Sequence, residues 1–184
     1  MSPPPALPDA EPADAPADGF SVLDDCHRMT LATLGRLDGL VAQLERGDLD
    51  ATTRTTAADI VHHFSTTMRQ HHHDEERHVF PALAASADGV VVQAVLRLQL
   101  DHDWLEEDWM EISGALDAVA CGQSWYDVDV LREGVAIFAA LLRDHIALEE
   151  TILYPQARAR LGAGEQREMG HEMAARRRAG RKTN

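Results

Sequence analysis

The feature that constrains this chain most is a long motif that occurs twice. Residues 64–81 read F-x3-M-x2-H-x3-E-E-x2-V-F-P, and residues 138–155 read F-x3-L-x2-H-x3-E-E-x2-L-Y-P, 74 positions later. A repeat of this length with a helical apolar spacing predicts two similar helical hairpins, packed around an approximate two-fold axis. Each hairpin then delivers a histidine followed four residues later by a glutamate.

Each copy of the motif follows a stretch that carries a single histidine on its apolar face. His102 lies 75 positions after His27, and a leucine precedes each of them by four residues, Leu98 and Leu23 respectively. The spacing is a weaker echo than the long motif. It predicts that each hairpin supplies one lone histidine and one His-x3-Glu pair.

Apolar periodicity predicts an all-α chain. The expected long helices span about 20–46, 52–83, 90–121 and 127–161, and a short fifth helix is expected at about 165–178. Short connections make sequential helices antiparallel, so the prediction is an up-down-up-down four-helix bundle. All four helices can then pass through one central layer, where their histidines would meet.

The chain divides by composition into three parts. Residues 1–19 are rich in Pro, Ala and Asp and carry too little apolar surface to order, so they are expected to form a disordered tail. Residues 20–161 form the bundle. Residues 162–184 are expected to form a short basic C-terminal helix or tail.

Composition also excludes several classes of partner. The 17 basic against 31 acidic residues give a net charge of −14, which argues against nucleic acid and anionic membranes as partners. No run approaches the roughly 18 apolar residues of a spanning helix. There is no secretory signal pattern, and Cys26 and Cys121 form no disulfide framework. We therefore expect a cytoplasmic protein, a monomer or a small oligomer, with Cys26 as a small buried filler.

The repeated His-x3-Glu spacing predicts a site for two cations. Residues four apart on a helix lie about 40° apart, so an imidazole and a carboxylate can aim at one point. Two buried carboxylates are stable only when paired or coordinated, and from opposite hairpins they can bridge two ions. Imidazole with carboxylate suits iron, manganese or zinc. The predicted ligands are His27, His71, Glu75, His102, His145 and Glu149.

The other histidines are harder to assign, because six of the ten fall between positions 62 and 78. His78 lies two turns after His71 and is an open alternative as a further ligand. His72 and His73 point about 100° and 200° away from His71, so we expect both on the surface.

The doubled motif, each copy preceded by a lone helical histidine, resembles the hemerythrin-like HHE cation-binding family over about residues 20–161. The resemblance implies a non-haem diiron centre. Its cofactor would be two iron ions with oxo, hydroxo or carboxylate bridges, and manganese or zinc remain alternatives. The same six residues match the family's ligand positions.

Two departures separate this chain from the oxygen-carrying members of that family. Their third helix carries His-x3-His, where this chain has His102 and Glu106; Glu106 is therefore a candidate seventh ligand. Their fourth helix carries His-x4-Asp, where His145 of this chain is followed by Glu149 at four positions and Glu150 at five. More carboxylate and less imidazole should stabilise ferric iron, which puts simple oxygen carriage in doubt.

The resemblance and the ligand set imply a diiron protein that reacts with dioxygen, hydrogen peroxide or nitric oxide in oxygen or oxidative-stress handling. Two alternatives stay open: a catalase-like enzyme that decomposes peroxide, and an iron or oxygen sensor or iron-buffer module. A ferritin-like oxidase is disfavoured, because those bundles use Glu-x2-His with the glutamate first.

Overall fold

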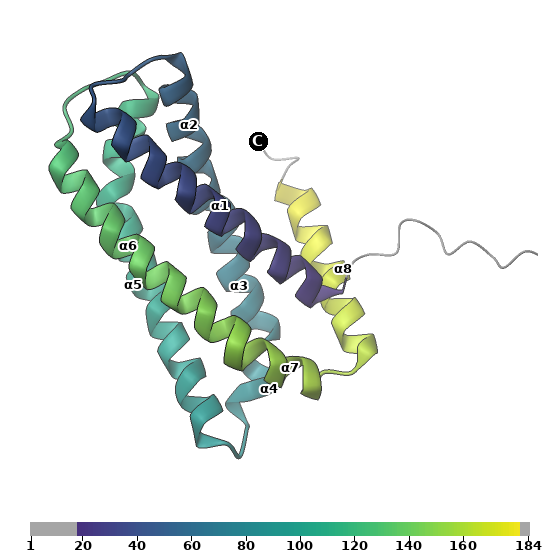
Figure 1. Cartoon of the computed structure of the whole chain (residues 1–184). Coiled ribbons are helices and arrows are strands. Elements are labelled where there is room, and N and C mark those ends of the chain that lie inside the picture. The colour runs from purple at the N-terminus through teal and green to yellow at the C-terminus, as the bar shows by residue number, and fades with distance from the viewer. Residues whose placement is uncertain (1–17, 181–184) are drawn as a thin grey trace, which may run out of the picture.

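The computed structural model describes residues 18–180, and every regular element in that range is helical (Figure 1). The first long helix is α1 (Gly19–Glu45) and the third is α5 (Gly89–Ala120). The second long helix consists of α2 (Ala51–His62), the π-helical turn η1 (His63–Met68), α3 (Arg69–His78) and the short α4 (Phe80–Ala84). The fourth consists of α6 (Val128–Leu148), the π-helical turn η2 (Glu149–Leu153) and α7 (Tyr154–Arg160), and α8 (Ala163–Gly180) comes after it. The predicted disordered tail lies outside the described residues, except that Asp18 and Gly19 begin α1.

An aspartate begins each of the four long helices. Asp18, Asp50, Asp88 and Asp127 accept hydrogen bonds from backbone N–H groups of the first turn, which would otherwise have no partner. After α1 and α5 the chain turns at Gly47 and Gly122, whose φ angles of 80° and 72° suit glycine. These signals set the lengths of the helices.

The four long helices confirm the predicted up-down-up-down bundle. α1 contacts α2 and α6, and α5 contacts the same two helices, so the four form a closed ring (Figure 1). Their buried side chains form two apolar clusters, one at each end of the bundle. One cluster includes Leu34, Phe64 and Phe138, and the other includes Leu23, Phe80 and Leu98. The predicted ligands lie between these clusters.

The expected short C-terminal helix is α8, which packs against α1. Met169 and Met173 bury their side chains in the second apolar cluster. Arg176 forms an ion pair with Asp74, a buried residue of α3. Helix α8 is therefore fixed to the bundle both by apolar packing and by a charge on the helix that carries His71.

The two π-helical turns do not occupy equivalent positions of the repeat. η1 precedes His71, whereas η2 begins at Glu149. π-helical turns are rare and often lie at functional sites, and here each lies in a long helix that carries a His-x3-Glu pair. None of the helices between residues 18 and 180 has the length and apolarity needed to span a bilayer.

Candidate metal centre

Six of the seven predicted ligands meet in the central layer of the bundle. His27 comes from α1, His71 and Glu75 from α3, His102 from α5, His145 from α6 and Glu149 from the first position of η2. All six are buried, with no more than 5% of any residue exposed.

The carboxylate of Glu75 lies between histidines of two helices. Its Oε1 is 3.4 Å from Nε2 of His71, and its Oε2 is 3.4 Å from Nε2 of His102. One glutamate thus places one oxygen on each side of the bundle axis.

Glu149 repeats this arrangement from the other hairpin. Its Oε2 is 3.1 Å from Nε2 of His27, and its Oε1 is 3.1 Å from Nε2 of His145. The cluster therefore has two sides that share both carboxylates. We call them the His27 side, with His27 and His71, and the His102 side, with His102 and His145.

The polar atoms of this cluster fit a metal better than they fit one another. Nε2 of His102 and of His145, Oε2 of Glu75 and both carboxylate oxygens of Glu149 are buried without a hydrogen-bond partner among the described residues. Each such atom costs about 1–3 kcal/mol if nothing compensates it. The histidine nitrogens and carboxylate oxygens lie close together but are not aligned for hydrogen bonds. This is the arrangement of ligand atoms that point at a shared ion.

A second pair of glutamates holds the lone histidines in place. Oε1 of Glu76 is 2.8 Å from Nδ1 of His102, and Oε1 of Glu150 is 3.1 Å from Nδ1 of His27. A histidine that donates Nδ1–H to a carboxylate presents its other nitrogen to a metal, which is the common arrangement around metal-binding imidazoles. Sequence reasoning gave these glutamates no role, although the doubled E-E of the repeat is the signal for it.

The aromatic residues that end the two motifs cover the same histidines. Tyr154 stacks on His27 with ring centroids 5.3 Å apart, and Phe80 stacks on His102 at 5.5 Å. The Tyr154 hydroxyl also donates to Oε1 of Glu75 at 2.5 Å. Among the described residues, the His27 side alone has a phenolic proton beside a shared carboxylate, at a repeat position that reads F in one copy and Y in the other.

The residue that precedes the lone histidine differs between the two halves of the repeat. Asp101 is buried, and its Oδ2 lies 3.8 Å from Nδ1 of His145. The matching position of the first half is Cys26, which is fully buried as expected. Burial raises the pKa of the Cys26 thiol to about 12, so it stays protonated and acts as packing.

Burial and mutual charge shift the protonation of the cluster. Burial alone would lower the pKa of His145, but the Glu149 carboxylate outweighs it and raises the pKa to about 10. Burial, reinforced by the Glu149 charge, raises the pKa of Glu75 to about 7. Burial would also raise the pKa of Glu149, but His145 outweighs it and holds that pKa well below its usual range. At neutral pH the cluster therefore holds protons that a cation would displace.

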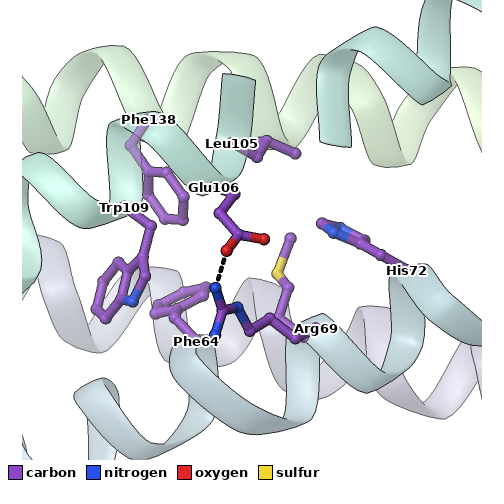
Figure 2. Close-up of a pocket in the computed structure, with 8 residues that line it drawn as sticks. Phe64, Arg69, His72, Leu105, Glu106, Trp109 and Phe138 are labelled. Atoms are coloured by element: carbon purple, nitrogen blue, oxygen red, sulfur yellow. Dashed lines mark ion pairs between the residues drawn. The ribbon is translucent and has the colours of Figure 1, made fainter. Parts of the chain in front are cut away.

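The structure does not bring the seventh candidate, Glu106, to this cluster. Its carboxylate forms an ion pair with Arg69, and 45% of the Glu106 side chain is exposed. The guanidinium on the neighbouring helix holds the carboxylate at the surface. Figure 2 shows this pair at a small, mostly apolar pocket, whose lining residues are Phe64, Met68, Arg69, His72, Leu105, Glu106, Trp109 and Phe138.

Of three further histidines, His73 and His78 lie away from the ligand cluster, whereas His72 lies against it. His73 is exposed, as predicted. His78 is placed against α8, with its Nε2 3.0 Å from Arg176. The expectation that His72 lies on the surface is wrong: its Nε2 is buried, and its ring stacks on His102 with centroids 3.9 Å apart.

A helical bundle with buried imidazoles and shared carboxylates defines the class: a four-helix bundle with a candidate metal site in its centre. The sequence model of the hemerythrin HHE cation binding domain matches residues 18–157. The chain therefore belongs to the hemerythrin HHE cation-binding family. A comparison with curated proteins finds no match.

Proposed function

We propose that this protein binds two iron ions, one on the His27 side and one on the His102 side, and reacts there with dioxygen, hydrogen peroxide or nitric oxide in oxygen or oxidative-stress handling. The observation that carries the proposal is the placement of the two shared carboxylates. Glu75 and Glu149 each have one oxygen within 3.4 Å of a histidine nitrogen on either side. Carboxylates placed in this way can bridge two cations.

The surroundings suit a small reactant. A pair of iron ions would supply electrons to a small oxygen- or nitrogen-containing molecule. The residues around them exclude bulk water, and the Tyr154 hydroxyl holds a proton beside Oε1 of Glu75. His72 lines a small, mostly apolar pocket, and the ion pair of Arg69 and Glu106 lies at the same pocket.

Metal analysis of protein purified without a metal-affinity tag tests the proposal. The expected result is two iron ions per chain, with an optical spectrum that changes when oxygen, peroxide or nitric oxide is added to the anaerobic ferrous form. His71→Ala and His145→Ala should lower iron content, while His73→Ala, an exposed neighbour, should not. Protein that binds no iron under anaerobic ferrous loading would refute the proposal.

A catalase-like activity is the second candidate, and the Tyr154 hydroxyl favours it. Two molecules of peroxide give two of water and one of dioxygen, and cleaving the O–O bond needs a proton close to the reacting oxygen. Oxygen evolution by the iron-loaded protein should be lost in His71→Ala and reduced in Tyr154→Phe. No measurable evolution by the loaded protein would exclude this activity.

A further inference from the structure

We infer that His72 is an additional nitrogen ligand on the His102 side, so that the two sides of the centre are held by different numbers of histidines. This inference rests on the proposed metal-binding function. It concerns a residue outside the doubled motif, because the matching position in the second half is Ile146.

The position of His72 on α3 directs it to the second side of the cluster. His71 and His72 are consecutive, so they point about 100° apart around the helix. The His71 ring lies 4.7 Å from that of His27 on α1, whereas the His72 ring lies 3.9 Å from that of His102 on α5. The two neighbours therefore face different helices, and each reaches a different side of the centre.

The ring nitrogen of His72 is placed as a ligand would be. Ligand atoms of His72, His102 and His145 all lie within 4.8 Å of one another. Nε2 of His72 is buried and has no hydrogen-bond partner among the described residues. A buried imidazole in a purely structural role normally satisfies its nitrogens with hydrogen bonds. The stacking on His102 occupies the face of the ring and leaves this nitrogen free for a cation.

Comparison of the two halves shows that packing alone does not require a histidine here. Ile146 fills the matching place, is 4% exposed and belongs to an apolar cluster. Glu106, the donor expected on α5, is held at the surface by Arg69. His72 supplies a donor from the neighbouring helix in place of Glu106. The His102 side then has three imidazoles, and the His27 side has two together with the Tyr154 hydroxyl.

The test compares His72→Ile, which copies the second half, with His73→Ile as the matched control on the adjacent exposed residue. Full-length protein is titrated anaerobically with ferrous iron, and with Co²⁺ as a spectroscopic probe, against a chelator. His72→Ile should weaken one of the two bound ions about 10- to 100-fold and leave the other unchanged, whereas His73→Ile should match wild type. X-ray absorption should count one imidazole fewer per pair of ions in His72→Ile.

The outcomes separate this inference from the proposed function. If wild type binds two ions and His72→Ile binds both with unchanged affinity and imidazole count, His72 is not a ligand and the metal centre stands. If wild type binds no metal while remaining helical by circular dichroism, the proposed function itself fails. If His72→Ile does not fold, His72→Gln is measured in the same way, because its amide keeps a polar side chain at this position.

Discussion

Glu76 and Glu150, the second glutamates of the two repeated E-E pairs, allow a prediction that tests how the ligand histidines are oriented. Glu76→Gln and Glu150→Gln keep the shape of each side chain but remove the charge facing Nδ1 of His102 and of His27, respectively. Each variant should weaken metal binding on its own side of the cluster. The physical reason is that the carboxylate fixes the ring orientation and raises the basicity of the opposite nitrogen.

The structure sets the size of this effect. Loss of such a partner typically costs 10- to 100-fold in metal affinity. The side chains of Glu76 and Glu150 are 46% and 48% exposed, so water screens them and the lower end applies. We therefore expect about a 10-fold loss for each variant, which corresponds to about 1.4 kcal/mol. Because the two variants act on different sides of the cluster, the double variant should lower the binding affinity for both ions.

Chelator competition with ferrous iron, resolved into two binding steps, measures this prediction. Glu111→Gln is the control, because it removes the same charge from an exposed residue of α5 that is not among the cluster. Equal affinities for Glu76→Gln, Glu150→Gln and Glu111→Gln would refute the reasoning. A loss on the wrong side in either variant would refute the assignment of its partner histidine.

The same geometry makes three further predictions. Metal binding at pH 7 should release protons, because raised pKa values keep His145 and in part Glu75 protonated in the metal-free cluster, so affinity should fall as pH falls; calorimetry in buffers of different ionisation enthalpy measures this, and no proton release would contradict it. Tyr154→Phe removes a buried hydrogen bond to a carboxylate and should destabilise the metal-free protein by about 1–2 kcal/mol in urea unfolding, whereas an unchanged midpoint would argue against that bond. Glu106→Ala should leave iron content unchanged in metal analysis, because its carboxylate pairs with Arg69 and not with the cluster; lost iron would instead make Glu106 a ligand.

The helices were predictable because their signals are local. Capping aspartates, terminal glycines and a 3.6-residue apolar period act within a few residues, and the observed bounds lie close to the expected ones. The π-helical turns were not predicted. They depend on how the long helices pack around the central polar layer, which no local pattern records.

The candidate site was predictable to the extent that it repeats. The four-residue spacing of His71 with Glu75 places two donors on one helical face whatever the tertiary details. His72 was misplaced because a bundle helix buries a broad arc, so two consecutive residues can both face the interior and contact different helices. Glu106, a candidate ligand from the sequence, lies outside the cluster because its carboxylate pairs with Arg69 on another helix, which no local spacing on its own helix indicates.

The His27 side and the His102 side have different neighbouring residues, although the two halves of the chain repeat the same motif. The ligands of the two hairpins match, but Tyr154 faces one lone histidine and Phe80 the other, and His72 has an apolar counterpart in Ile146. Each half is therefore a natural reference for the other. Exchanging residues between matching positions, such as Tyr154→Phe or Phe80→Tyr, would make the sides more alike within a single molecule. Any difference in behaviour that disappears on such an exchange belongs to the neighbours of the ligands rather than to the ligands themselves.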